Sequence, residues 1–394
     1  MITHIEIEGF KSLKKVALDL GGLNIFIGTN ASGKTNFFEA LRVLQGIGYG
    51  FSISEIFDGK PKSATGEVWE PIRGGSDLAS FLDPAAAEPS RIVRFTVKLK
   101  ATGLELLRYS IAIDTGAIGV HDESLHSGDA SIFTTKSVDP FRVDAGSRGV
   151  FAFDGSRPVL AQIPAKRLNT EHEVELVETC SQLLSNAQVL DPLAGNLRDY
   201  SKVHLAMRMG DHGENFAGLV SSILRQEKSA AAYTSWLKEL TPAELDEVRP
   251  IRGALKEPLF AVRRGSQKIP APILSDGTLR FAAIAAAFFQ PDMPYTLLIE
   301  EIETGLHPTR LRLLLELLKS QSASGTQVMA TSHSPQVLAW LTDDDYKTTF
   351  LCRKDDETGA STITPLSEVP GFLDLARKQP AADLFAEGWL EGAL

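Results

Sequence analysis

Cysteine is nearly absent from this sequence, and no long apolar run occurs in it. Its 394 residues include only Cys180 and Cys352. Two distant cysteines exclude a disulfide-rich secreted scaffold and have no metal-ligand spacing, so we expect buried thiols in a reducing, cytoplasmic setting. The longest uncharged apolar run, residues 281–289, is too short to span a bilayer, and Met1–Ile5 lacks the features of a secretory signal. We therefore expect no membrane partner.

The sequence also lacks an excess of positive charge. Its 40 Lys and Arg against 50 Asp and Glu give a formal net charge of −10, which argues against a uniformly basic nucleic-acid surface. A local basic groove stays compatible with that total, because net charge hides the distribution of charges. The sequence has no internal repeat and no sustained heptad pattern, which excludes a long coiled coil. A hydrophobic content of 43% is typical of a globular chain of one large or two moderate domains.

Alternation of apolar and polar residues predicts an antiparallel N-terminal lobe. Two strands are expected over 2–10 and 16–20, and period-2 segments separated by turn residues continue from 91 to 163. Leu23–Ile27 is predicted to be a buried strand. Residues 46–89, which are rich in Gly, Pro and Ser, predict loops with little regular structure.

The middle of the chain changes to helical periodicity. Helices are predicted over 171–187, 216–224, 230–240 and 242–248. This change indicates an inserted helical subdomain. We therefore divide the chain into an N-terminal lobe of residues 1–164, a helical insertion of residues 165–257 and a C-terminal lobe of residues 258–394.

The C-terminal lobe alternates between helices and strands. Helices are predicted over 278–289, 309–319 and 335–341, and strands over 295–299, 328–331 and 349–352. Such alternation implies a mainly parallel sheet with helices on its faces, so the chain is expected to be an α/β protein.

A glycine-rich loop lies between the strand at 23–27 and a helical pattern at 37–44. Glycines let the backbone N–H groups point at phosphate oxygens, and the following helix presents its positive end to the anion. Lys34 can bridge β- and γ-phosphates, and the Thr35 hydroxyl can ligate Mg²⁺. This context predicts a P-loop NTPase that binds ATP and Mg²⁺ through Gly28, Asn30, Ala31, Ser32, Gly33, Lys34, Thr35 and Asn36.

Two carboxylates follow the buried strand at 295–299. Glu300 would hold Mg²⁺, directly or through water, and Glu301 would orient or deprotonate the attacking water. Ligands of α/β proteins bind at the carboxyl ends of the strands, and charges so close to a buried apolar run are otherwise costly. The alternative is a strand that simply runs out into solvent. After the next strand, His333 could contact the γ-phosphate as a polar sensor.

The segment Leu274–Arg280 lies between the phosphate loop and the acidic strand. At the start of the predicted helix, the Ser275 hydroxyl and the Gly277 backbone N–H would face a γ-phosphate. An ordinary N-cap by Ser275 or Asp276 is the alternative. The position of the segment between the other motifs favours the phosphate-binding interpretation.

These segments resemble the RecF/OLD-like group of ABC-type ATPases, in particular the short AAA-type ATPases of bacterial defence and toxin–antitoxin loci. Leu274–Arg280 resembles their signature motif, 5–13 their opening, Asn30–Asn36 their phosphate loop and Glu300–Pro308 their acidic strand. The resemblance implies an ABC-type ATPase head with an antiparallel β lobe and an inserted helical subdomain. It also implies a homodimer that holds two ATPs, each capped by the other subunit's signature.

The sequence leaves two functions open. The first is an ATPase whose closing and opening regulates a separate effector protein in phage defence or a toxin system. The second is a DNA-binding, ATP-gated clamp in repair or recombination, in which Arg94, Lys98, Lys100 and Arg108 contact double-stranded DNA. Only residues 346–394 follow the last motif, so we expect no appended nuclease.

Overall fold

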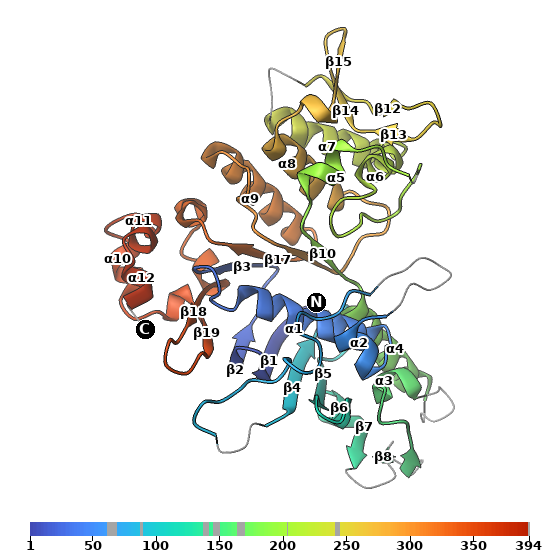
Figure 1. Ribbon diagram of the computed structural model, residues 1–394, viewed down its shortest axis with the longest axis vertical. Helices are drawn as coiled ribbons and strands as arrows, with labels where there is room; N and C mark the ends of the chain where they lie inside the picture. Colours follow the sequence, from blue (N-terminus) through green and yellow to red (C-terminus); the bar gives the residue numbers. More distant parts are fainter. Residues whose placement is uncertain are drawn as a thin grey trace. The chain divides into compact units, whose positions relative to one another are not determined.

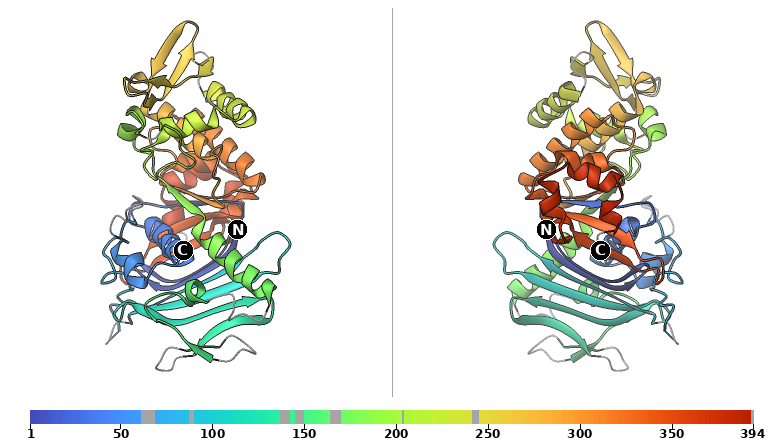
Figure 2. Two further views of the ribbon diagram at one scale, coloured as in Figure 1. Left: turned by 90° about the vertical axis from the view of Figure 1, so that its right-hand side faces the viewer. Right: turned by 90° about the vertical axis from the view of Figure 1, so that its left-hand side faces the viewer.

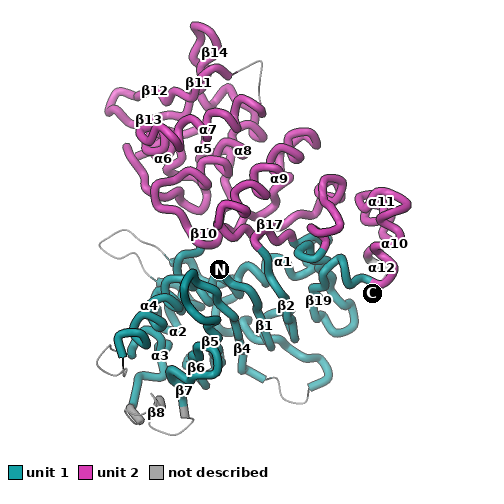
Figure 3. Tube along the Cα trace, turned by 180° about the vertical axis from the view of Figure 1, so that it is seen from behind, with its two compact units in different colours: residues 1–21, 26–187, 347–369 teal, residues 22–25, 188–346, 370–394 magenta. Residues whose placement is uncertain are grey.

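The structure, a computed structural model, describes residues 1–60, 69–86, 90–136, 142–144, 150–163, 170–202, 204–240 and 245–392. The chain forms two compact units (Figure 3), the first of residues 1–21, 26–187 and 347–369 and the second of residues 22–25, 188–346 and 370–394. The three-part division made from the sequence stays a prediction, and its boundary at residues 164 and 165 lies outside the described residues.

The first unit is built on a sheet of antiparallel strands in the order β2-β1-β4-β5-β6-β7-β8-β9 (Figure 1). Figure 2 shows this sheet as a curved layer. The strands are β1 (Ile2–Phe10), β2 (Leu13–Asp19), β4 (Ile92–Leu99), β5 (Leu107–Asp114), β6 (Gly119–Ser127), β7 (Ala130–Lys136), β8 (Arg142–Asp144) and β9 (Val150–Ala152). The predicted antiparallel lobe is therefore confirmed.

Helices pack against this sheet, in whose strands buried apolar side chains alternate with more exposed ones. Every second residue of a strand points to the same face of a sheet. Among the residues that alternate in this way, Ile5, Val97 and Tyr109 have no exposed surface. Elements that contact the sheet or one another here are α1 (Lys34–Gly48), α2 (Ile53–Asp58), α3 (Val159–Gln162) and α4 (Glu171–Ser185). The unit also contains the antiparallel pair β18 (Thr349–Lys354) and β19 (Ser361–Pro365).

The prediction of loops over 46–89 is wrong at α2. The Ser52 Oγ accepts a hydrogen bond from the Glu55 N–H at 3.2 Å, and Glu55 Oε2 accepts one from the Ser52 N–H at 2.8 Å. This capping box satisfies two N–H groups that a helix end leaves unpaired, so a short helix forms despite the surrounding glycines. Residues 61–68 and 87–89 of the stretch lie outside the described residues.

The second unit contains strands flanked by helices. Its strands are β10 (Ala187–Leu190), β16 (Thr296–Ile299) and β17 (Gln327–Ser332), in that order in the sheet. The next strand in the order is β3 (Leu23–Ile27), whose first residues belong to this unit. The last residues of β3 belong to the first unit, as does β18, which follows β3 in the order. β16 and β17 are parallel, with Leu298 beside Met329. The structure thus confirms the α/β class.

Helices and short strands make up the rest of the second unit. They are α5 (Ala194–Arg198), α6 (Phe216–Ile223), α7 (Glu227–Leu240), α8 (Asp276–Ala287), α9 (Pro308–Ala323), α10 (Phe372–Ala376), α11 (Ala381–Ala386) and α12 (Trp389–Gly392), with β11 (Glu247–Val248), β12 (Ile251–Arg252), β13 (Pro258–Leu259), β14 (Ala261–Arg264) and β15 (Gln267–Pro270). Short 3₁₀ helices occur at Ala271–Ile273 and Pro335–Trp340 here, and at Leu366–Glu368 in the first unit. A further one, Asp345–Lys347, lies where the chain passes from the second unit to the first.

Two helix predictions need correction. The predicted helix at 242–248 is wrong at its end, because Glu247–Val248 is a strand that pairs with β14; residues 242–244 lie outside the described residues. The predicted α-helix at 335–341 is a 3₁₀ helix. At Glu247–Val248, pairing with a distant strand overrides the local helical preference. At Pro335–Trp340, the helix is wound more tightly than an α-helix.

Cys180 and Cys352 are both free and buried, as the sequence predicts. Within the described residues, no helix combines the length and the apolar character needed to cross a membrane.

A carboxylate is buried between the sheet and α3. Glu123 on β6 is 1% exposed, and its Oε2 accepts a hydrogen bond from the Val159 N–H at 2.6 Å. Its Oε1 accepts from the Leu160 N–H and the Tyr109 hydroxyl, both at 2.9 Å. Burial raises the pKa of Glu123 to about 7, although these three hydrogen bonds act in the opposite direction.

We expect this carboxylate to make folding stability depend on pH. Because the folded-state pKa lies above the unfolded value of 4.5, the proton-linked stability is fully present below that value and is lost as the pH rises through about 7. Glu123→Gln should remove a difference on the order of 3 kcal/mol between acidic and neutral pH. Urea unfolding at a series of pH values measures it, and parallel wild-type and variant curves would contradict the assignment.

Candidate functional site

The phosphate loop predicted from the sequence lies between β3 and α1. The strand ends at Ile27, and α1 begins at Lys34 with Gly33 as its N-cap at φ 105°. In the part of the chain that the structure describes, no side chain caps this helix end, and its first turn contains no acidic residue. Its first N–H groups and the positive end of the helix dipole are therefore suited to bind an anion.

Gly33 approaches its neighbours too closely for any side chain. A Cβ atom at this position would meet the Ser361 hydroxymethyl group, with the Ser361 Cβ only 2.7 Å away. The Ser361 Oγ donates a hydrogen bond to the Ser12 Oγ at 2.7 Å, and the Asn36 amide donates to the same oxygen at 2.7 Å. Glycine is thus required here, and the side chain of Asn36 is bound within the first unit.

Lys34 lies across the loop that precedes it. Its ammonium donates hydrogen bonds to the Gly28 carbonyl at 2.7 Å and to the Thr29 carbonyl at 2.8 Å. Thr29, Asn30 and Ala31 are exposed at the tip of the loop, whereas Ser32 is buried and Thr35 is half-buried. The loop therefore places a cation beside exposed backbone, which is an arrangement suited to a polyphosphate.

The acidic strand end lies in the second unit. Glu300 and Glu301 follow the buried strand β16, and the Glu301 N–H donates to the Thr331 hydroxyl of β17 at 2.9 Å. Glu301 has a left-handed backbone at φ 47°, and its exposed carboxylate accepts a hydrogen bond from the Thr304 hydroxyl at 3.1 Å. Non-glycine residues seldom adopt this conformation without support from their neighbours. The two hydrogen bonds supply that support and hold the carboxylate in one direction.

The segment Leu274–Arg280 caps and starts α8. The Ser275 Oγ accepts a hydrogen bond from the Thr278 N–H at 3.2 Å, as in an ordinary N-cap. Gly277 is buried, and a Cβ there would collide with the Gly305 carbonyl oxygen. The start of α8 therefore packs directly on the turn that follows Glu300 and Glu301.

Arg280, one turn further along α8, connects the same two segments. Its side chain is 8% exposed and donates to the Glu300 carbonyl at 2.6 Å and to the Glu301 carbonyl at 3.3 Å. It also donates to the Pro192 carbonyl at 2.8 Å and lies 3.3 Å from the Asp191 carboxylate. Sequence reasoning missed this role, for which the only signal was a single charge at the start of an apolar helix.

The second unit thus brings Ser275, Gly277, Glu300, Glu301 and His333 into one set of connected segments. The phosphate-loop residues belong to the first unit, and the roles of both sets stay predictions. His333 follows β17 and is exposed, and it contacts Glu303, a residue to which sequence reasoning gave no role.

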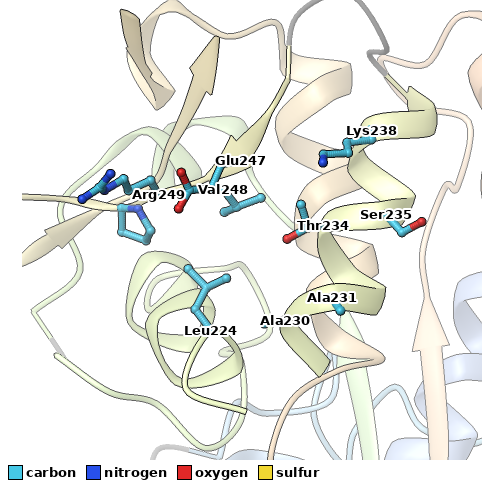
Figure 4. A pocket seen from close by; sticks show the side chains of 10 residues that line it. Leu224, Ala230, Ala231, Thr234, Ser235, Lys238, Glu247, Val248 and Arg249 are labelled. Atoms are coloured by element: carbon cyan, nitrogen blue, oxygen red, sulfur yellow. The ribbon is translucent and has the colours of Figure 1, made fainter. Parts of the chain in front are cut away.

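The second unit also has a concave surface that these segments do not line. A cleft of about 620 Å³ opens between the end of α6, α7 and the strand β11 (Figure 4). None of the predicted site residues lines it. Its lining residues are Leu224, Ala230, Ala231, Thr234, Ser235, Lys238, Glu247, Val248, Arg249 and Pro250.

We expect Arg280→Leu to destabilise the second unit. The substitution keeps most of the volume but leaves several buried acceptors without a donor, which should cost roughly 2–4 kcal/mol of unfolding free energy. Arg312→Leu is the control, because Arg312 on α9 is 58% exposed and pairs with Glu316. That control should cost less than about 1 kcal/mol. Equal losses in chemical denaturation would contradict the role of Arg280.

Family models match two parts of this chain. Residues 165–339 match a family described as an AAA domain, putative AbiEii toxin, Type IV TA system. Residues 1–63 match a family described as an AAA ATPase domain. The two matches cover the phosphate loop, the signature segment, the acidic strand and His333.

The chain is also similar to curated proteins. It is 22% identical over 396 aligned positions to an ATP/GTP phosphatase of Helicobacter pylori, covering 91% of this chain and 93% of that protein. It is 36% identical over 121 positions to the DNA replication and repair protein RecF of Nitrosococcus oceani. That second alignment spans 28% of this chain and 32% of RecF.

Solved SMC heads have a similar fold. An SMC head bound to the C-terminal winged-helix domain of ScpA aligns with a TM-score of 0.53 at 15% identity, over 93% of this chain and 98% of that chain. An Smc head domain with an extended coiled coil, bound to the C-terminal domain of ScpA derived from Pyrococcus furiosus, aligns with a TM-score of 0.54 at 13% identity, over 95% and 99%. At such identities the likeness shows the fold alone.

Proposed function

Because this chain belongs to the RecF/OLD-like ABC-type ATPases, we propose that it binds ATP with Mg²⁺ and hydrolyses it as a homodimer that encloses two ATPs. The observation that carries the proposal is the uncapped N-terminus of α1, beside Lys34 and behind a Gly33 that admits no side chain. The Helicobacter relative, named an ATP/GTP phosphatase, supports hydrolysis of a nucleoside triphosphate.

In this proposal the first unit holds the phosphates. The N–H groups of the loop and of the first turn of α1 bind phosphate oxygens, and Lys34 exchanges its carbonyl partners for the β- and γ-phosphates. The Thr35 hydroxyl, which makes no hydrogen bond with a described residue, would hold Mg²⁺ together with Glu300. A hydroxyl and a carboxylate are ligands that fit this ion, which when bound neutralises charge on the phosphoryl oxygens.

The second unit supplies the groups for hydrolysis. Glu301 is the proposed base: its carboxylate is exposed, and the Thr331 hydroxyl and Thr304 hold its backbone and side chain in place. His333 is the proposed sensor of the γ-phosphate. Ser275 and Gly277 of one subunit would cap the ATP of the other, so that the site is complete only in the dimer.

We further propose that the ATP cycle controls a separate effector protein in phage defence or a toxin system. The family model over residues 165–339 is described as a putative AbiEii toxin of a Type IV TA system. Two SMC heads of the same fold were solved with domains of the partner ScpA bound. Both observations support a partner-coupled head.

Lys34→Ala should abolish ATP binding, because it removes the cation that neutralises the phosphates. Isothermal titration with ATP and Mg²⁺ measures this loss. Lys14→Ala is the control, since Lys14 pairs with Asp83 and should leave the affinity unchanged. Normal affinity in the Lys34 variant would rule out the assigned site.

Glu301→Gln should bind ATP normally but turn it over at least about a hundredfold more slowly, because the base is lost. Trapped with ATP, it should accumulate as a dimer in analytical ultracentrifugation. The double variant with Lys34→Ala should stay monomeric and serves as the control. A strictly monomeric Glu301→Gln protein at saturating ATP and Mg²⁺ would count against the enclosed-ATP dimer.

A DNA-binding, ATP-gated clamp is the second candidate function. Lys98 of β4, Arg108 of β5 and His126 of β6 are directly opposite one another across the sheet, in one row. Neither Lys98 nor Arg108 forms a salt bridge with a described residue, whereas Arg94 is neutralised by Asp122 at 2.6 Å. The partial similarity to RecF, named a DNA replication and repair protein, adds support.

Double-stranded DNA distinguishes the two functions. If the protein is a DNA clamp, DNA should stimulate steady-state ATP turnover. The double variant Lys98→Ala, Arg108→Ala should then lower the slope of log affinity against log salt concentration by about two units. Lys15→Ala, which removes a paired surface charge, is the control. An ATP turnover rate that does not change when DNA is added would favour control of a protein effector.

A further inference from the structure

Glu303 is joined to His333 by two contacts to the same carboxylate oxygen. The Glu303 Oε1 accepts a hydrogen bond from the His333 backbone N–H at 2.6 Å. The same oxygen lies 3.0 Å from the His333 Nδ1. The turn after β16 and the segment after β17 are therefore held together at the histidine itself.

The two side chains differ in exposure. The Glu303 side chain is 9% exposed, whereas that of His333 is 46% exposed. Glu303 is thus the buried partner of the pair, and the imidazole is the accessible one. The other carboxylate oxygen, Oε2, is buried and has no hydrogen-bond partner among the described residues. A buried carboxylate with one unpaired oxygen is costly for stability, so packing alone does not explain a glutamate here.

The two contacts restrain both the backbone and the ring of His333. The backbone hydrogen bond holds the start of the side chain beside the Glu303 carboxylate. With Nδ1 3.0 Å from the same oxygen, the other ring nitrogen, Nε2, faces away from Glu303. Glu303 therefore restrains the direction in which His333 presents Nε2.

We propose that Glu303 is a positioning residue that orients His333 toward the γ-phosphate of bound ATP. The inference rests on the proposed role of His333 as the γ-phosphate sensor. Glu303 acts on turnover only through the ring, and it contributes little to ATP affinity. Its effect should therefore depend on the presence of the histidine.

A double-mutant cycle with Glu303→Met and His333→Ala tests this dependence. Each single substitution should lower kcat about tenfold, the lower end of what loss of an orienting carboxylate costs, with KM for ATP nearly unchanged. The double variant should be no slower than His333→Ala alone. Glu316→Met, on the exposed face of α9, is the control and should leave kcat unchanged.

Glu303→Gln covers the case in which the methionine variant folds poorly. Its amide oxygen can accept the backbone hydrogen bond and lie beside Nδ1, so most of the kcat should be recovered.

The failures are separable. If His333→Ala leaves kcat unchanged, the sensor role and the inference both fail. If His333→Ala slows turnover but Glu303→Met does not, if Glu303→Gln is as slow as His333→Ala, or if the losses add in the double variant, only the inference fails.

Discussion

The arrangement of the second unit depends on one buried guanidinium. Arg280 lies on α8 but satisfies the carbonyls of Glu300 and Glu301, and it is itself balanced by Asp191 and the Pro192 carbonyl. These partners offset the cost of burying a cation, so each of these segments helps to fix the position of the others. Among the described residues, only the Arg280 Nε has no partner in this arrangement. The contact of Gly277 with Gly305 adds a second link between α8 and the turn after β16. A displacement of Ser275 would therefore be transmitted to the backbone of Glu301, the proposed base, through the contacts of α8 with the turn after β16.

The same segments combine strain with restraint. Glu301 adopts a left-handed backbone that costs on the order of 1 kcal/mol for a residue with a side chain. Hydrogen bonds from its N–H to Thr331 and to its carboxylate from Thr304 offset this cost. Such a residue keeps its direction only while its neighbours stay in place, which is a property expected of a group that must be aligned before it acts.

Local patterns predicted much of this fold, and contacts between distant segments account for the rest. The antiparallel lobe, the strand before the phosphate loop and the parallel strands β16 and β17 follow from alternation and apolar runs, because burial on one or both faces imposes those periods. The strand at Glu247–Val248 could not be predicted from its own residues, since its partner β14 decides its conformation. The helix α2 was missed although its capping box is visible at Ser52 and Glu55. For the proposed site, motifs predicted Lys34 and Glu301, whereas Arg280 and Glu303 contact partners about twenty to ninety residues away and have no local pattern.

The chain passes between its two compact units within a single strand. Residues 22–25 of β3 group with the second unit and the following residues with the first, and residues 347–369 return to the first unit before the C-terminal segment rejoins the second. Neither unit is therefore a continuous stretch that a pair of cuts could release as an autonomous fragment. Deletions intended to isolate one half would leave strands without their neighbours, and such fragments are prone to aggregate. Complementation by two separately expressed pieces, or insertion of a reporter at an exposed turn, is the route by which this protein can be divided without losing its sheets.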